Sequence, residues 1–208
     1  MHGGVLFCAI VMFEIALYPG KIFMAEILAV TDPADINIVA NLAHEIWNQH
    51  YIPIIGQEQV DYMLGKFQNA QAIGEQITQG FRYYILSHQG QSVGYFALVP
   101  DQKTASAQLS KIYIRHDQRR LGLGRGIMAF VEAYCRKTGI RELWLTVNKH
   151  NADAIAFYQR MGFVTESVLV QDIGNGFVMD DYRLVKPLDK DENSTMTEMP
   201  GILKTNPH

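Results

Sequence analysis

The chain has 208 residues, 48% of them hydrophobic, which is enough for one well-buried domain and short for two. Its formal net charge of -3 gives no reason to expect a nucleic-acid partner, and its composition fits a cytoplasmic enzyme without identifying one. Two cysteines, Cys8 and Cys135, exclude a disulfide framework or a zinc cluster, so we expect no metal site.

The two ends of the chain differ from its middle. An apolar run at residues 5–13 is interrupted by Glu14; no Lys or Arg precedes it, and a membrane span needs ~20 apolar residues. We expect residues 1–24 to lie outside the fold, with Met24 as the natural start, residues 1–23 as an upstream extension and no membrane partner; a weak membrane anchor is the alternative. Residues 189–208 are polar, lack apolar periodicity and are predicted to be a disordered tail.

Residues 25–188 are predicted to form one domain that alternates strands and helices. Residues 27–30 are typical of a strand, and Thr31-Asp32-Pro33 starts a helix whose apolar positions run from Ile36 to Ile46. Further helices are expected around residues 60–67 and 70–79. Strands at 81–88 and 92–99 flank a hairpin turn at 89–91, and alternation at 108–114 predicts the next strand.

A basic, glycine-rich turn at residues 119–126 joins that strand to an amphipathic helix. Glycines let backbone approach a ligand closely, and the first turn of a helix presents unpaired N–H donors, so the turn suits a phosphate. Arg125 stands where a P-loop needs lysine, and Ile127 where the dinucleotide fingerprint needs glycine. The pattern that remains is Arg/Gln-x-x-Gly-x-Gly, from Arg119 to Gly124.

The second half of the domain continues the alternation. The helix after the turn should end near Lys137-Thr138-Gly139, and residues 143–147 are typical of a buried strand. A helix at 151–161, closed by Gly162, and a strand pair at 164–171 and 178–186 complete the domain. The prediction is an α+β sandwich around a mixed, largely antiparallel sheet.

A second motif makes a family recognisable. Asn151, Ala154, Phe157, Tyr158, Gly162 and Phe163 match Asn-x-x-Ala-x-x-Phe-Tyr-x-x-x-Gly-Phe at every fixed position, 27 residues after Gly124. With the glycine-rich turn, residues 25–188 resemble the GNAT superfamily of N-acetyltransferases, nearer its small-amine and polyamine branch. The resemblance implies the GNAT (acyl-CoA N-acyltransferase) fold, acetyl-CoA as co-substrate, and direct attack of a primary amine through a tetrahedral intermediate.

The resemblance also implies roles for particular residues. The backbone of Ile112, Tyr113 and Ile114 would pair with the pantetheine arm of acetyl-CoA and donate an N–H to the thioester carbonyl. Asn151 would bond the same arm, Ala154 would leave room for it, and Tyr158 would contact the cofactor and protonate the leaving thiolate. The pyrophosphate would lie on the turn itself, formed by Arg119, Arg120, Leu121, Gly122, Leu123, Gly124, Arg125 and Gly126.

Several of these residues also have a purely structural explanation. Phe157 and Phe163 are expected in the core, Tyr158 could pack there as well, and Asn151 is a favoured helix N-cap. Arg115 and Arg120 could be solvated surface charges, which leaves Arg119 and Arg125 as the favoured phosphate contacts.

The base and the acceptor stay open at this stage. Where some family members carry a glutamate, the strand offers Gln108 and Ser110, so a chain of waters, His44, Glu45, Asp180 or Asp181 could accept the amine's proton. Residues implied around the acceptor are His44, Trp47, Tyr51, 173–177, Asp180 and Asp181. This aromatic and acidic set suits a small cationic amine; the alternatives are a peptide or protein N-terminus, or a non-catalytic acyl-CoA sensor. A homodimer is expected only because dimers are the commonest oligomers.

Overall fold

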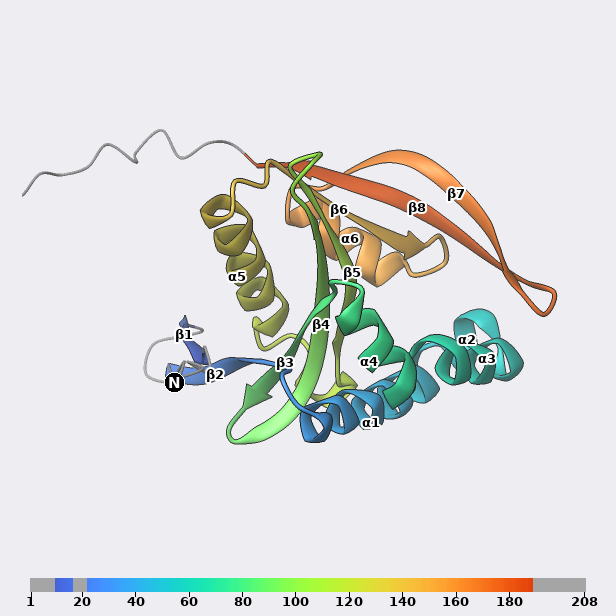
Figure 1. Ribbon diagram of the computed structural model, residues 1–208, viewed down its shortest axis with the longest axis horizontal. Helices are drawn as coiled ribbons and strands as arrows, with labels where there is room; N and C mark the ends of the chain where they lie inside the picture. The colour runs from blue at the N-terminus through green and yellow to red at the C-terminus, as the bar shows by residue number, and fades with distance from the viewer. Residues whose placement is uncertain (1–9, 17–21, 189–208) are drawn as a thin grey trace, which may run out of the picture.

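The computed structural model describes residues 10–16 and 22–188 (Figure 1). In this part of the chain eight strands form one sheet in the order β1-β2-β3-β4-β5-β6-β8-β7. The strands are β1 (Ile10–Ala16), β2 (Ile22–Ala29), β3 (Arg82–His88), β4 (Gln91–Asp101), β5 (Ser106–Ile114), β6 (Glu142–Asn148), β7 (Val164–Gly174) and β8 (Phe177–Pro187). Every neighbouring pair is antiparallel except β5 and β6, which confirms the predicted mixed, largely antiparallel sheet.

Helices cover both faces of the sheet and enclose two cores. On one face lie α1 (Pro33–His50), α2 (Ile52–Ile55), α3 (Gln57–Phe67) and α4 (Ala70–Thr78). On the other face lie α5 (Leu123–Lys137) and α6 (Ala152–Arg160), and a short 3-10 turn, η1 (His116–Gln118), precedes α5. Figure 1 shows α5 separated from α1 and α4 by the strands β4 and β5.

Helix α1 forms for the reasons that its sequence suggests. The Asp32 carboxylate accepts hydrogen bonds from the backbone N–H groups of Ala34 and Asp35, and Pro33 occupies the first turn, where its missing N–H costs nothing. Its buried stripe is Val39, Leu42, Ala43, Ile46 and Trp47. The helix therefore presents one apolar face to the sheet and carries its last turn, with His50, to the centre of the molecule.

Helix α2, the η1 turn and strand β1 were not predicted. Helix α2 is a single turn in the apolar run after Tyr51, started by Pro53 and ended by Gly56 at φ 82°. Strand β1 pairs with β2 from Ile10 to Ala16, so described residues before position 25 continue the edge of the sheet. The boundary at residues 24 and 25 stays a prediction, and residues 1–9 and the predicted tail at 189–208 lie outside the described residues.

The parallel strands β5 and β6 form a fork. They pair only from Ser106 with Glu142 to Gln108 with Trp144, and beyond this rung β5 stays with β4 while β6 stays with β8. Figure 1 shows the two strands diverging. Ser110 is skipped in the register between β4 and β5, since Leu109 faces Leu98 and Lys111 faces Ala97. This bulge bends β5 where the fork opens.

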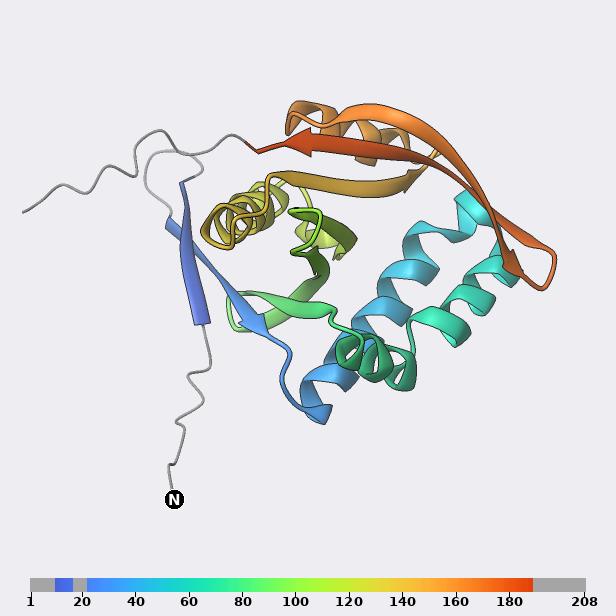
Figure 2. The ribbon, with the colours of Figure 1, turned by 45° about the horizontal axis from the view of Figure 1, so that its top comes forward.

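The β7–β8 hairpin reaches back to the helical layer. The hydroxyl of Tyr62 on α3 donates to the carbonyl of Ile173 at 2.5 Å, and the Lys66 ammonium donates to the same oxygen at 2.7 Å. Ile173 itself is buried, and the Phe177 ring lies 5.2 Å from that of Tyr62. Figure 2 shows the hairpin curving toward the ends of α2 and α3. Hydrogen bonds between α3 and the β7–β8 hairpin thus close the end of the fork that lies away from the β5–β6 pairing.

Candidate active site

The fork holds a cavity of about 880 Å³. Pockets for ligands the size of a drug or a cofactor fall between ~300 and ~1,000 Å³. Its lining includes residues of β5 and β6, the η1 turn, the first turn of α5, and α6. The predicted contacts Ile112, Tyr113, Ile114, Arg119, Arg120, Gly122, Leu123, Gly124, Arg125, Asn151, Ala154 and Tyr158 all line it.

The first turn of α5 is free to bind an anion. Its N-cap, Gly122, adopts a left-handed conformation at φ 79°, which side chains disfavour. No described side chain caps the helix, so the N–H groups of Leu123, Gly124 and Arg125 have no side-chain acceptor. Unpaired N–H donors and the positive end of the helix dipole together make this turn an anion site.

Two predicted pyrophosphate contacts lie elsewhere. Of the described residues in the glycine-rich turn, Leu121 and Gly126 are outside the cavity lining. Leu121 packs against the core beneath α5. The Gly126 N–H is the first one beyond the four unpaired N–H groups of the helix start and donates to the Gly122 carbonyl at 3.1 Å, so it is not available to a phosphate.

The arginines of the turn divide into held and exposed groups. Arg119 donates from Nε to the Ile114 carbonyl at 3.1 Å, and its Nη1 lies 3.3 Å from Nδ1 of His50. Arg115 pairs with Glu45 and Asp117, at 3.3 and 3.2 Å. Arg120 and Arg125 are exposed and line the cavity. We infer that these two are the mobile cations of the site, while Arg119 braces β5 against the end of α1.

Gly124 is confined on the side away from the turn. A Cβ built there would lie 3.1 Å from Cζ and 3.3 Å from Cε2 of Phe157. Contacts that short force the ring to shift, so glycine lets α5 and α6 approach each other. The requirement for glycine therefore has a packing reason beside the predicted approach to phosphate.

Asn151 joins α6 to the end of α1. Its side chain accepts from the Ala154 N–H at 3.3 Å, which confirms the predicted N-cap, and it is only 6% exposed. Its side chain also lies near His50 and Tyr51, and it opposes the shifts in their pKa values. Burial, reinforced by the nearby Arg119 charge, lowers the pKa of His50, and burial raises the pKa of Tyr51 to about 12. Both side chains are therefore neutral at pH 7.

Tyr158 lies deep in the same cavity. Its ring packs edge-on against Phe157 and Phe163, at centroid distances of 5.4 and 5.8 Å, and is 7% exposed. Burial, with a smaller contribution from Tyr51, raises its pKa far above the usual range. The predicted packing role and the lining of the cavity thus coexist in one side chain.

A second, smaller cavity of about 180 Å³ lies on the other face of the fork. Its lining is Gln108, Trp144, Thr146, Leu169, Gln171, Met179 and Asp181. Gln108 and Trp144 form the last paired rung between β5 and β6, and Thr146 lines both cavities. The two cavities therefore meet where the strands part.

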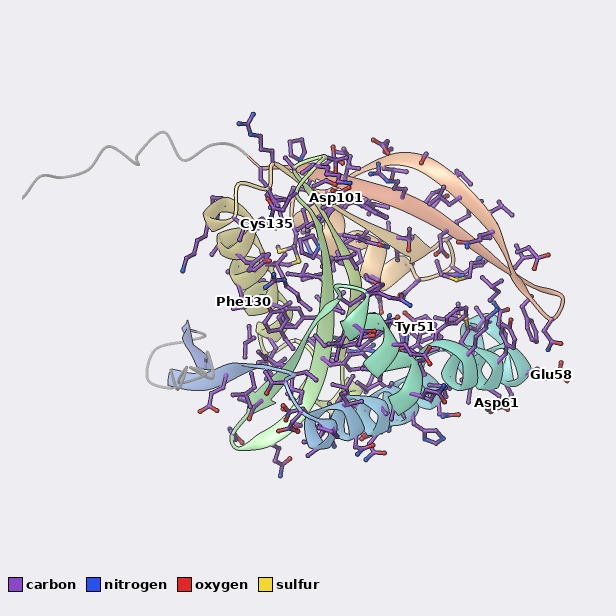
Figure 3. All side chains as sticks on the ribbon, in the orientation of Figure 1. Tyr51, Glu58, Asp61, Asp101, Phe130 and Cys135 are labelled. Atoms are coloured by element: carbon purple, nitrogen blue, oxygen red, sulfur yellow. The ribbon has the colours of Figure 1, made fainter. Side chains whose placement is uncertain are left out.

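The residues predicted around the acceptor separate in space. Asp181 lines the smaller cavity and Tyr51 the larger one, while Trp47 is buried against Tyr51 with their rings 4.5 Å apart. Figure 3 shows Tyr51 near the centre of the molecule. His44 is exposed and outside both linings, and Asp180 forms an ion pair with Lys149. Ile173 and Phe177 pack against α3 instead of entering a cavity.

Several lining residues were missed from the sequence. Trp144 and Thr146 alternate with the buried Leu143, Leu145 and Val147, so period-two alternation places them together on the opposite face. The sequence thus contained the signal that these two residues share a face. It contained no signal for the residues of other strands that line the smaller cavity with them. His50 carried no sequence signal, since only the fold brings it to Arg119 and Asn151.

The forked sheet, with the uncapped start of α5 at its mouth, places the domain in the α+β class with the acyl-CoA N-acyltransferase fold. The model of the acetyltransferase (GNAT) family matches residues 41–163, and the chain belongs to this family. Members of the family use acetyl-CoA as their acetyl donor.

Curated relatives match part of the chain. An uncharacterized N-acetyltransferase in the pepI 3' region of Lactobacillus delbrueckii subsp. lactis is 32% identical over 108 residues, 49% of this chain and 62% of that protein. The [ribosomal protein bS18]-alanine N-acetyltransferase of Escherichia coli (strain K12) is 34% identical over 87 residues, 37% of this chain and 59% of that protein. The chain thus spans about three-fifths of the length of these relatives.

A solved structure matches more of the fold. The PaiA N-acetyltransferase from Thermoplasma acidophilum, in complex with coenzyme A, superposes with a TM-score of 0.67 over 78% of this chain and 98% of that chain. At 19% sequence identity the likeness concerns the fold. In the described part of the chain, no helix is both long enough and apolar enough to cross a membrane.

Proposed function

We propose that the protein transfers the acetyl group of acetyl-CoA to the primary amine of a small molecule. The observation that carries this proposal is the meeting of two cavities at the fork. The larger has an anion-binding helix start and a buried tyrosine, and the smaller has a carboxylate. A donor and an acceptor that enter from opposite faces meet at the fork.

The larger cavity suits acetyl-CoA along its whole length. The pyrophosphate lies on the N–H groups of Leu123, Gly124 and Arg125, with Arg120 and Arg125 as cationic partners. Charge-assisted bonds of this kind are roughly twice as strong as neutral ones. The pantetheine arm follows the unpaired edge of β5 from Ile112 to Ile114 and passes Asn151 and Ala154, which line the opposite wall.

The thioester then lies at the base of the fork. The bulge at Ser110 releases backbone groups of β5 from their pairing with β4. An N–H preorganised toward the developing oxyanion contributes ~3 kcal/mol in comparable sites. The same β5 backbone therefore holds the cofactor and stabilises the tetrahedral intermediate.

Tyr158 is the proposed acid that protonates the leaving thiolate. With ordinary pKa values of ~10 for tyrosine and ~8.5 for a thiol, this transfer runs uphill by ~2 kcal/mol. Burial raises the tyrosine pKa and so increases this figure. Because the thiolate is desolvated in the same cavity, its basicity rises as well and the two values move together.

The acceptor is small because its end of the fork is both narrow and closed. The cavity of about 180 Å³ lies below the ~300 Å³ lower end of typical ligand pockets. The ties from Tyr62 and Lys66 to Ile173 hold the hairpin against α3, where a peptide acetyltransferase needs an open groove. The likeness to a ribosomal-protein alanine acetyltransferase keeps a protein N-terminus as the second candidate.

A thiol-release screen tests this function. Acetyl-CoA is incubated with the protein and with alkylamines, polyamines, amino acids, aminoglycosides or short peptides, and the free thiol is measured. Turnover with a small amine is the expected result. Turnover with peptides alone would favour the second candidate, and tight binding of acetyl-CoA without thiol release would indicate a non-catalytic sensor.

A further inference from the structure

Asp181 is an unusual side chain for its surroundings. It is 4% exposed, and its Oδ1 atom is buried without a hydrogen-bond partner among the described residues. The Thr146 hydroxyl lies close enough to this carboxyl to favour its charged form. A buried carboxylate oxygen that lacks a donor is unfavourable unless a ligand supplies one. This oxygen is therefore available to accept a hydrogen bond from a ligand in the smaller cavity.

The position of Asp181 relates it to the reaction. It lies on β8 opposite Asn148 of β6, which is two residues after Thr146 on the same strand. Its side chain lines the smaller cavity at the fork. Thr146 lines both cavities, so a group bound to Asp181 faces the proposed thioester position from the side opposite α6. An amine held there has a direct approach to the acetyl carbon.

The charges around Asp181 fit a cationic ligand. Burial raises the pKa of its carboxyl to about 6, Asp180 adds to this, and Thr146 and Lys149 oppose it. Lys149 is already paired with Asp180, and Arg183 on the same strand is paired with Glu142 and Glu166. Tyr51, a neutral phenol, is near enough for the Asp181 charge to add to the rise in its pKa. The neighbouring cations thus have other partners, and an ammonium would be the fitting donor.

We propose that Asp181 binds the ammonium group of a small primary alkylamine in this cavity and accepts its proton, which frees the nitrogen to attack acetyl-CoA. This inference rests on the proposed function and names its acceptor class and its base. Of the candidates open at the level of sequence, His44 is exposed away from both cavities, Glu45 is paired with Arg115, and Asp180 is paired with Lys149.

The proton and electron balance closes. The ammonium passes one proton to the Asp181 carboxylate, and the nitrogen lone pair forms the C–N bond. Collapse of the tetrahedral intermediate breaks the C–S bond, and the thiolate takes the proton of Tyr158. The Tyr158 phenolate takes the second nitrogen proton, and Asp181 releases its proton to water. One ammonium and one thioester give one amide, one thiol and one proton.

Burial brings the two partners of the proton transfer closer in pKa. A free alkylamine has a pKa of ~10.4, so only about 1 molecule in 2,500 is unprotonated at pH 7. Desolvation lowers the pKa of an ammonium and raises that of a carboxyl. The transfer is therefore easier inside the cavity than in water, where an ordinary aspartate would be a poor base.

The test compares Asp181→Asn with the wild-type chain on two acceptors between pH 6 and 10. n-Butylamine is protonated across most of this range, whereas 2,2,2-trifluoroethylamine is mostly unprotonated at pH 7 and needs no base. Glu58→Gln is the matched control, because Glu58 is exposed on α3, outside both cavities and far from Tyr51 in Figure 3. Initial rates of thiol release give kcat/KM, and calorimetry gives the affinity for acetyl-CoA.

We expect Asp181→Asn to lower kcat/KM for n-butylamine at pH 7 by about 10²-fold or more, the range of a lost general base. The deficit should shrink by about tenfold for each unit of pH, because only the variant depends on amine that is already free. With trifluoroethylamine the loss should be less than about tenfold, and the affinity for acetyl-CoA should not change. Glu58→Gln should match the wild type throughout.

Three outcomes would overturn the inference. Equal kcat/KM for n-butylamine in Asp181→Asn and wild type removes Asp181 alone and leaves the proposed function standing. An equal loss with both amines at every pH shows a structural role and not a base. Absence of thiol release by the wild type with every amine, despite bound acetyl-CoA, rejects the proposed function and the inference with it.

Discussion

Tyr158 combines two roles that are usually separate. Its ring packs in the core against Phe157 and Phe163, and the residue also lines the larger cavity. Because burial raises its pKa, the phenol stays protonated at every working pH. It therefore always carries the proton, although the raised pKa makes its transfer harder, and removal of the hydroxyl leaves the packing of the ring in place.

Tyr158→Phe should lower kcat by roughly 10² to 10⁴ through loss of the acid. The affinity for acetyl-CoA, measured by calorimetry, should stay within a few-fold of wild type, and the melting temperature should barely move. Unchanged turnover in this variant would remove Tyr158 from the mechanism. A large loss of stability would show that the hydroxyl serves the core.

The helical glycines Gly124 and Gly65 form a matched pair. A Cβ at Gly65 meets nothing within 4 Å, so Gly65→Ala should stabilise α3 by up to ~1 kcal/mol. A Cβ at Gly124 meets the Phe157 ring at 3.1 Å, so Gly124→Ala should lose that gain and weaken acetyl-CoA binding about tenfold or more. Thermal melts and calorimetry measure the two effects. Equal behaviour of both variants would contradict the packing account and the assignment of the turn.

Asp181 should also make stability depend on pH. Its pKa is about 6 in the folded chain and ~3.9 when unfolded, so its ionisation destabilises the folded state above about pH 6 by on the order of 3 kcal/mol. Below about pH 4 the carboxyl is protonated in both states and this term vanishes. Asp181→Asn should therefore gain stability relative to wild type as the pH rises from 4 to 8, in denaturant titrations at both values. A pH-independent difference would show that the carboxyl is not buried in solution.

At the scale of elements, the fork is the feature that creates the site. Periodicity predicted α1, α3, α4, α5, α6 and most strands, because burial of one face repeats every 3.6 or 2 residues. Motifs placed the larger cavity, since Gly122 and Asn151 carry local backbone roles that the sequence reveals. These are the parts of the fold that depend on residues close together in the chain.

The parts that sequence missed depend on distant residues. The rung where β5 leaves β6 is set by packing on both faces, so nothing near Gln108 predicts that Asp181 lies across the same small cavity. Helix α2 was missed because four residues show no period. Gly126 was predicted to bind phosphate from its position in the motif, but helix geometry already uses its N–H.

The hydrogen bond from Tyr62 to the β7–β8 hairpin gives a prediction for binding of the amine acceptor. Tyr62→Phe removes the hydroxyl that donates to the Ile173 carbonyl, a bond worth about 1 kcal/mol. The hairpin should loosen, and KM for the amine should rise by up to about fivefold while acetyl-CoA affinity stays constant. Steady-state kinetics at saturating acetyl-CoA measure this change. A change in acetyl-CoA affinity instead would show that the hairpin acts on the donor side.

At the scale of the whole molecule, the sheet separates two cores and two ligand approaches. One core packs under α5 and α6 beside the larger cavity, and the other lies under α1, α3 and α4. In the proposed function each ligand approaches from its own face, and Thr146 lines both cavities. The expected homodimer stays a prediction, which light scattering against the 23.5 kDa chain mass would test.

The central claim is that donor and acceptor meet in the fork and exchange an acetyl group. A single-turnover experiment tests it most directly: excess protein is mixed with acetyl-CoA and a small primary alkylamine, and the products are identified by mass spectrometry. One N-acetylated amine and one free thiol are expected for each acetyl-CoA consumed. Intact acetyl-CoA and unmodified amine after prolonged incubation, with the cofactor bound, would contradict it.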